Sequence, residues 1–462
     1  MRFITGDEVG LTKIIAPAPP PENDQNDCPS KRRKASEKPQ KDIDEPAGPR
    51  MTTTTLGTMD RGGEVQLMCW AVWKTQRDTV VVARKDGRVQ YLRLEDGSVV
   101  REHVVFRERR GEDGKVVVNK YKKGEHFVGL HDVEGTLVAC TDLGFVHIIP
   151  SPESNAPTSP LPSGTFTTSH ALTFRARLHP QHTHLLATGG DECDLTIWNL
   201  AEQFPNTTTE ETSTTPPPTQ LTAHWTSRNV KNDFLNIRVP VWITELAFLD
   251  STATRLIVGT GHHQIRIYDT TLARRPIVDI TVGTHPIRSL AVYPVDNASE
   301  GVVKTVCSDT TGQMMQVNVD CKAKTAKVVG KYAGLAGAVT DVAIPAGAET
   351  VVSVGLDRLL RVFELEGGRK LVQKVYLKQR LCRVLVDDTE AETAAVGNAK
   401  GQVGATETAT AGNGDEESEA EDDDVWAEIS VVGGKQSATN GKAKKRKSTS
   451  KDGKSSKRKG VS

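Results

Sequence analysis

The chain has 462 residues, of which 37% are hydrophobic and 5% aromatic, and its 59 basic and 59 acidic side chains cancel to a formal net charge of zero. The hydrophobic share is low for one compact domain of this length, so we expect part of the chain to build no core. No apolar run approaches the ~18 residues needed to cross a bilayer, and the acids Asp7 and Glu8 stand where a signal peptide would be apolar. We therefore expect a soluble, intracellular protein with no membrane partner.

Pairs of alternating apolar and polar segments, separated by tight turns, recur along the chain. Alternation at period two is typical of half-buried strands. Turn sequences such as Lys85-Asp86-Gly87 favour hairpins, because glycine reaches the positive φ that a tight turn needs. We count seven such units: residues 2–15, 79–92, 136–149, 172–200, 244–269, 287–319 and 339–365.

Three of the units end in an aromatic residue followed by a polar or acidic one. These endings are Trp198-Asn199, Tyr268-Asp269 and Phe363-Glu364, and most unit endings lie about 50 residues apart. An ending and a spacing of this kind are typical of WD-type blades, which take roughly 40–45 residues each. The sequence therefore predicts an all-β fold, a seven-bladed WD40-type β-propeller.

Two stretches have a composition that cannot bury enough apolar surface to offset the entropy of ordering. Residues 16–60 contain proline-rich, basic and threonine-rich runs, and residues 203–222 are rich in Thr and Pro. We expect both to be disordered insertions in a propeller that spans residues 1–388. Residues 389–462 are expected to form a disordered tail with an acidic run and a lysine-rich end.

The two ends of the predicted propeller are expected to close the ring. An open sheet edge invites pairing with other chains. The first unit starts at Arg2 and leaves no room for an earlier strand of its own, whereas residues 374–377 and 381–386 form strand patterns beyond the seventh unit. We expect these strands to complete blade seven and then lend a strand to blade one, so that residues near Phe3 lie beside residues near Val384.

Candidate catalytic and metal-binding residues are sparse. His179, His182 and His184 lie close together, but no cysteine or carboxylate at ligand spacing accompanies them. The seven cysteines are scattered without a C-x-x-C pair, so we expect buried free thiols in a reducing compartment. Phosphate-binding, dinucleotide-binding, nucleophile-elbow and zinc-protease motifs are absent. We expect no enzyme activity, metal, cofactor or small-molecule substrate.

The stretch from Trp225 to Trp242 is the candidate partner-binding segment. Between the tryptophans, Arg228, Lys231 and Arg238 alternate with apolar residues. Interleaved cations and aromatic side chains suit either RNA phosphates and bases or a protein interface. The alternative is a long loop between blades whose tryptophans pack on the rim of the sheets and whose charges are solvated.

The expected tail contains two blocks of like charge. Residues 415–424 include eight acids and no base, and a short apolar patch at Trp426 follows them. Residues 435–459 include eleven Lys or Arg and one acid, a composition typical of nuclear-import or nucleic-acid-binding segments. Residues 31–34 form a second, shorter basic run. The nuclear-localisation-like residues are Lys444, Lys445, Arg446, Lys447, Lys457, Arg458 and Lys459.

The motifs N-V-K-N-D at residues 229–233 and R-V-P-V-W at residues 238–242 resemble the signature of the Nop-seven-associated WD-repeat family. The strand patterns at 355–363 and 374–377 are similar to its last blade, and the acidic run with Trp426 is similar to its tail. The chain departs from the family in its Pro-rich and Thr/Pro insertions. Partner-binding residues expected in the stretch from 228 to 242 are Arg228, Asn229, Lys231, Asn232, Asp233, Arg238 and Trp242; we expect the three cations to face partners and Trp242 to anchor packing.

This resemblance implies a non-enzymatic assembly factor for the large (60S) ribosomal subunit. Such a factor would be a propeller scaffold in the nucleus and nucleolus, bound to early pre-60S particles that contain pre-rRNA and other assembly factors, and released by a separate AAA-type ATPase. Two other functions remain open: a WD-repeat scaffold subunit of a tRNA-modifying methyltransferase, and another nuclear protein-interaction adaptor. They differ from the first in the proteins and RNA that would co-purify.

Overall fold

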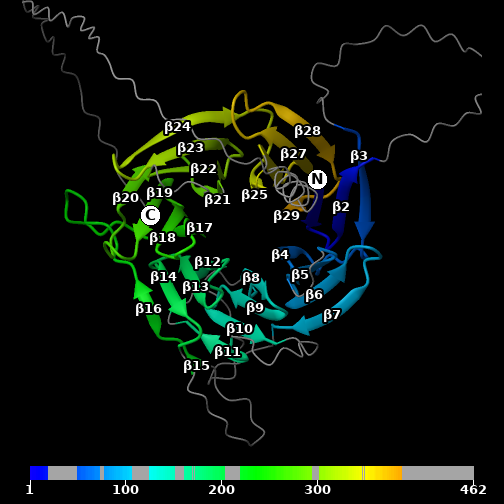
Figure 1. Cartoon of the computed structure of the whole chain (residues 1–462), viewed down its shortest axis with the longest axis horizontal. Coiled ribbons are helices and arrows are strands. Elements are labelled where there is room, and N and C mark those ends of the chain that lie inside the picture. Colours follow the sequence, from blue (N-terminus) through cyan, green and yellow to red (C-terminus); the bar gives the residue numbers. More distant parts are fainter. Residues whose placement is uncertain are drawn as a thin grey trace, which may run out of the picture. The chain divides into compact units, whose positions relative to one another are not determined.

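The computed structural model describes residues 1–18, 49–72, 77–106, 124–150, 161–168, 170, 172–202, 219–293, 301–345, 347 and 349–387. All of these residues belong to one compact unit, Met1–Val403. The regular elements in this part of the chain are all β-strands, and they form seven sheets arranged as a ring (Figure 1). The prediction of a seven-bladed β-propeller is confirmed.

The strands of each blade are ordered from the centre of the ring outward. Blade one consists of β29 (Leu381–Asp387), β1 (Arg2–Asp7), β2 (Thr12–Pro17) and β3 (Met51–Leu56). Blade two consists of β4 (Val65–Trp70), β5 (Thr79–Arg84), β6 (Arg88–Arg93) and β7 (Val99–Val104). Blade three consists of β8 (Phe127–Val133), β9 (Thr136–Thr141), β10 (Phe145–Ile149), β11 (Gly164–Thr167) and the short parallel strand β15 (Thr219–Gln220).

The remaining blades have four strands each. Blade four consists of β12 (Thr173–Leu178), β13 (Leu185–Gly190), β14 (Thr196–Asn199) and β16 (Ala223–Thr226). Blade five consists of β17 (Ile243–Phe248), β18 (Arg255–Thr260), β19 (Gln264–Asp269) and β20 (Val278–Thr281). Blade six consists of β21 (Ile287–Val292), β22 (Val302–Asp309), β23 (Met314–Asp320) and β24 (Thr325–Tyr332). Blade seven consists of β25 (Val339–Ala343), β26 (Thr350–Gly355), β27 (Leu359–Glu364) and β28 (Leu371–Tyr376).

The hydrophobic core lies between neighbouring blades, and strand β5 shows why. Successive side chains of a strand point to opposite faces of the sheet. Val80 and Val82 pack in a cluster with Ile4 of blade one, whereas Val81 packs in another cluster with Leu137 of blade three. Because a blade is covered on both faces, its inner strands are apolar on both sides, and burial of these valines removes a large apolar area from water.

The chain ends close the ring in the way that the sequence predicts. Strand β28 completes blade seven by pairing with β27. Strand β29 then pairs antiparallel with β1, with Phe3 opposite Val386 and Thr5 opposite Val384. The innermost strand of blade one therefore comes from the far end of the described chain, and its contacts with β4 and β25 join blades two and seven to it.

The extent of the two insertions was predicted incorrectly. In the first, β2 continues to Pro17, and Met51–Leu56 forms β3, the outermost strand of blade one, whose threonines are exposed. Threonine is β-branched and suits an edge strand, a preference that outweighs the polar composition of this run. In the second, Thr219–Gln220 pairs with β11. The rest of both stretches, 19–48 and 203–218, and the tail from 388 onward lie outside the described residues.

Candidate interaction surface

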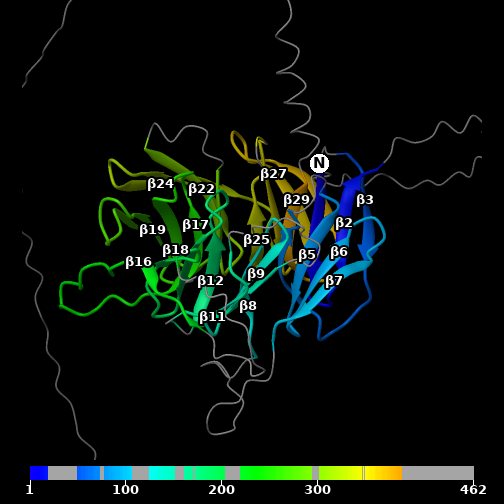
Figure 2. The same ribbon diagram turned by 60° about the horizontal axis from the view of Figure 1, so that its bottom comes forward.

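The segment from Ser227 to Trp242 connects the outermost strand of blade four, β16, to the innermost strand of blade five, β17. We call it the β16–β17 loop. It contains no regular strand and extends outward beside β16 (Figure 2, green). The chain travels here from the rim of one blade to the centre of the next, a connection that is much shorter between β20 and β21 and between β28 and β29.

Main-chain and arginine hydrogen bonds fix the start of this loop to the turn between β19 and β20. The amide of Arg228 donates to the carbonyl of Arg274 (2.7 Å), and Arg274 Nε donates back to the carbonyl of Thr226 (2.7 Å). Arg275 Nε donates to the carbonyl of Asn229 (3.2 Å). Two arginines that are distant in the sequence therefore lie beside the loop.

The two asparagines and the aspartate of the N-V-K-N-D motif hold the loop in shape. Asn229 Nδ2 donates to the carbonyl of Val239 across the loop (2.6 Å). Asp233 Oδ1 accepts from the amides of Leu235 (2.9 Å) and Ile237 (2.8 Å). Side chains of this kind stabilise turns by replacing backbone partners.

Asn232 and Asn236 complete the turn at the outer end of the loop. Asn232 Nδ2 donates to Oδ1 of Asn236 (3.0 Å) and to its carbonyl (3.1 Å). Asn236 has a φ of 60°, in the left-handed region that asparagine tolerates better than most residues. The residue types at Asn229, Asn232 and Asp233 are thus explained by the local backbone that these side chains hold.

The three candidate cations occupy different environments. Arg228 and Lys231 are exposed, and within the described part of the chain neither forms an ion pair. Arg238 is exposed but paired with Glu192, which lies in the turn between β13 and β14. The structure therefore places Arg274 and Arg275 beside the start of the loop, near Arg228, leaves Lys231 exposed within the loop, and places Arg238 in a link to blade four.

Trp242 and Trp225 pack against the propeller. Trp242 is half-buried, bridges to Asp191, and meets His262 edge-on with 5.8 Å between ring centroids. Its ring lies directly over Gly261, where an added Cβ would stand 2.1 Å from ring atoms. Trp225 in β16 meets Tyr268 edge-on at 6.3 Å.

Sequence reasoning missed the apolar outer end of the loop. Phe234 is 95% exposed, Leu235 63% and Ile237 58%. We call these three residues the apolar tip. The sequence shows them only as apolar residues among the cations of the segment, whereas in the structure they belong to no strand and are exposed.

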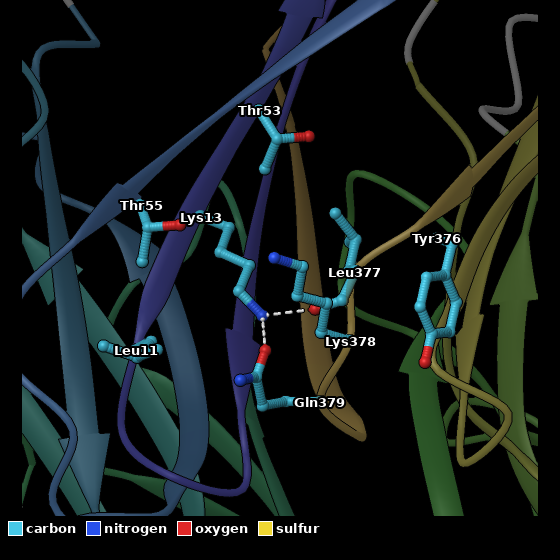
Figure 3. Close-up of a pocket in the computed structure, with 8 residues that line it drawn as sticks. All are labelled: Leu11, Lys13, Thr53, Thr55, Tyr376, Leu377, Lys378 and Gln379. Carbon is cyan, nitrogen blue, oxygen red and sulfur yellow. Dashed lines mark hydrogen bonds between the residues drawn. The ribbon is translucent and has the colours of Figure 1, made fainter.

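A separate, polar pocket of about 310 Å³ lies between the outer parts of blades one and seven (Figure 3). Lys13 is its central charged group. The ammonium donates to the carbonyl of Leu377 (2.6 Å) and to Gln379 Oε1, and it lies 2.9 Å from Oδ2 of the buried Asp7. With its partners all within the propeller, Lys13 joins β2 to the segment that follows β28.

His179 forms hydrogen bonds within the propeller, and the thiols of Cys140 and Cys307 are buried. His179 Nε2 is 2.8 Å from the carbonyl of Asp250, and its Nδ1 accepts from the amide of His182 (2.8 Å). Burial raises the pKa of the Cys140 and Cys307 thiols to about 12. Among the described residues, no group of His, Cys, Asp and Glu could hold a metal ion, and no helix is long and apolar enough to cross a membrane.

Comparison with known proteins relates the chain to two sets of WD-repeat proteins. WD repeat-containing protein 74 of Bos taurus is 29% identical over 330 residues, which cover 71% of this chain and 73% of that protein. Ribosome biogenesis protein NSA1 of Yarrowia lipolytica is 26% identical over 405 residues, covering 83% and 88%. The resemblance to the family of NSA1 and WD repeat-containing protein 74 is therefore confirmed.

Other comparisons are narrower in extent. The NSA1 protein of Meyerozyma guilliermondii is 34% identical over 223 residues, which cover 45% of this chain and 53% of that one. No protein-family model matches the chain. Among solved structures, the β-propeller domain of Myceliophteria_thermophila Cps50 (Swd1) gives a TM-score of 0.47 at 14% identity, over 68% of this chain and 87% of that chain.

Proposed function

We propose that this protein belongs to the NSA1 family and acts in ribosome biogenesis as a non-enzymatic assembly factor for the large (60S) subunit. In this proposal, the propeller is a rigid scaffold bound to early nucleolar pre-60S particles during rRNA processing. The observation that supports it most directly is the similarity to a ribosome biogenesis protein over 83% of the chain. The fold agrees with such a role, because a closed propeller presents stable loops to partners without needing a catalytic cleft.

The β16–β17 loop is the surface that we propose for docking on the particle. It projects from the ring on a fixed base, and the exposed cations Arg228 and Lys231 have no acidic partner in the described part of the chain. Asn229, Asn232 and Asp233 would act through the shape of the loop, Arg238 through its link to Glu192, and Trp242 through packing. Unpaired surface cations of this kind attract an acidic partner and accelerate association.

We further propose that the protein acts in the nucleus and nucleolus, and that the basic residues 444–447 and 457–459 serve as its nuclear-localisation signal. The proposal also includes release of the protein from the particle by a separate AAA-type ATPase, as the family resemblance implies. Residues 444–447 and 457–459 lie outside the described part of the chain, so the proposed nuclear location depends on their basic composition.

Affinity purification of the tagged full-length chain, with identification of the bound RNA and proteins, tests this function. We expect precursors of the large-subunit rRNA together with large-subunit assembly factors. Recovery of a single methyltransferase without such precursors would show instead that the chain is a scaffold for a tRNA-modifying enzyme. A double variant, Arg228→Glu with Lys231→Glu, should reduce recovery of the precursors several-fold while leaving the fold intact, because neither side chain is buried.

A further inference from the structure

Three large apolar side chains on a single turn, the apolar tip of Phe234, Leu235 and Ile237, are exposed to solvent. A fourth exposed apolar residue, Leu272 at 72%, lies in the β19–β20 turn that is hydrogen-bonded to the base of the loop. Single exposed hydrophobic residues are common on protein surfaces and need no explanation. A group of them at one place is typical of an interaction site.

The tip is held outward by polar bonds that do not involve its apolar side chains. Besides the bonds to Asp233 Oδ1, the amide of Asp233 donates to the carbonyl of Ile237, and the amide of Asn236 donates to the carbonyl of Asp233, both at 3.0 Å. The backbone at the tip is therefore ordered before any partner arrives. A preorganised loop loses little conformational entropy on binding, which favours tight docking by a small apolar surface.

The charge around the tip indicates the character of its partner. Arg228 and Lys231 on the same loop, and Arg274 and Arg275 in the turn bonded to its base, are exposed, and within the described residues none of these four pairs with a carboxylate. Of the nearby acids, Glu192 is paired with Arg238 and Asp233 accepts the turn hydrogen bonds. The complementary surface is apolar at its centre and acidic at its edge.

The apolar side chains also favour protein over RNA as the partner. Recognition of single-stranded RNA relies on stacking of bases on aromatic rings or guanidinium planes. Phe234 could stack in this way, but Leu235 and Ile237 have no π face and gain from burial only in an apolar pocket. Leu235 and Ile237 therefore favour a protein, and not an RNA, as the partner of the tip.

We propose that Phe234, Leu235 and Ile237 insert as a preformed unit into an apolar pocket, bordered by acidic side chains, on a protein of the assembly particle. This inference rests on the proposed function, since it names the kind of partner that the docking loop meets. Within it, the apolar tip supplies the buried contact that keeps the complex together. The four cations steer the approach and contact the acidic border.

Site-specific photo-crosslinking in cells tests the proposal. Phe234 is replaced by p-benzoylphenylalanine in the tagged full-length chain, and Tyr376, an exposed aromatic residue on β28, is replaced in the same way as the control. We expect the first variant to crosslink to one protein, at a segment with apolar and acidic side chains, in a yield at least ten times that of the control. Crosslinking to RNA, or a yield equal to that of the control, would overturn the proposal.

A paired substitution gives a second and independent measurement. Phe234→Ser with Leu235→Ser should lower co-sedimentation of the chain with large-subunit precursors by at least ten-fold without lowering its melting temperature. Val99→Ser with Val104→Ser, which removes two exposed apolar residues from β7, is the matched control and should leave co-sedimentation unchanged. If the wild type co-sediments and the tip variant does so equally, the tip proposal is wrong; if the wild type fails to co-sediment, the proposed function is wrong.

Discussion

Arg2 and Asp387 form an ion pair that joins the first strand of the propeller to the last described one. Arg2 Nη2 lies 2.6 Å and Arg2 Nε 2.9 Å from Oδ2 of Asp387, and the two residues stand opposite each other in the pairing of β1 with β29. The Asp387 side chain is 6% exposed, so water replaces the lost partner poorly if Arg2 is removed. The ring is thus closed by side chains as well as by backbone hydrogen bonds.

Removing this pair should destabilise the whole ring. We expect Arg2→Met to lower the free energy of unfolding by about 1–2 kcal/mol, because it removes two charge-assisted hydrogen bonds to a mostly buried carboxylate. Denaturant unfolding measures the change. Arg93→Met is the control, since Arg93 and Asp96 are both exposed and 3.9 Å apart, and a pair of this kind contributes less than about 1 kcal/mol. Equal losses in the two variants would contradict the closing role of Arg2.

Glu245 should be a critical link between blades four and five. Its carboxylate is 2% exposed, with Oε2 2.8 Å from Arg175 Nε and Oε1 3.1 Å from Arg177 Nη2. Burial alone would raise the pKa of Glu245, but the two guanidiniums lower it to about 2. We expect Glu245→Gln to lower the free energy of unfolding by about 3 kcal/mol, since it leaves two arginines without a counter-charge.

The matched control for Glu245 is Glu366→Gln. Glu366 pairs with Lys304 at 2.8 Å, but its side chain is 58% exposed. This pair is solvated, so its loss should change the free energy of unfolding by less than about 1 kcal/mol. A control variant as unstable as Glu245→Gln would show that burial does not decide the effect.

Stability should decline between pH 7 and pH 4 because of His131. Burial, with Arg177 nearby, lowers the pKa of His131 from 6.5 to about 4, and its Nε2 accepts a hydrogen bond from the amide of Leu178 on the next blade. In this range the unfolded chain binds a proton that the folded chain does not, so stability is lost as pH falls through 6.5. We expect a loss of about 2 kcal/mol by pH 4, measured by denaturant unfolding at each pH.

His131→Gln is the variant that tests the source of this pH dependence. Glutamine keeps a hydrogen-bond acceptor but does not titrate, so its stability should vary less between pH 7 and pH 5 than that of the wild type. An unchanged slope would show that another group titrates.

The position of Trp242, and with it the end of the β16–β17 loop, should depend on Gly261. Alanine at 261 would place its Cβ 2.1 Å from atoms of the Trp242 ring, so the ring must move. We expect Gly261→Ala to lower stability by about 1–3 kcal/mol and to shift tryptophan fluorescence to the red, as the ring becomes more exposed. Gly124→Ala, where nothing lies within 4 Å of the added Cβ, should alter neither property.

The sequence by itself determined the architecture of this protein. Period-two alternation and glycine turns located the seven blades, and residues 381–386 could be assigned to close the ring, because strand patterns and turn chemistry are local properties of the chain. The same reasoning missed β3, since it counted the threonines of 51–56 by polarity and not by their preference for a strand. Strand β3 forms the outer edge of its sheet and pairs with β2 alone, so its threonines can be exposed although the segment is a strand.

Tertiary structure alone decided which side chains of the candidate loop face solvent. Phe234 and Val241 belong to the same apolar pattern, yet one is exposed and the other is buried against blade four. Arg274 lies beside Thr226 although 48 positions separate them in the sequence. Burial and charge grouping depend on neighbours that the fold brings from distant segments, so no local pattern could have placed Arg274 and Arg275 beside the start of the loop.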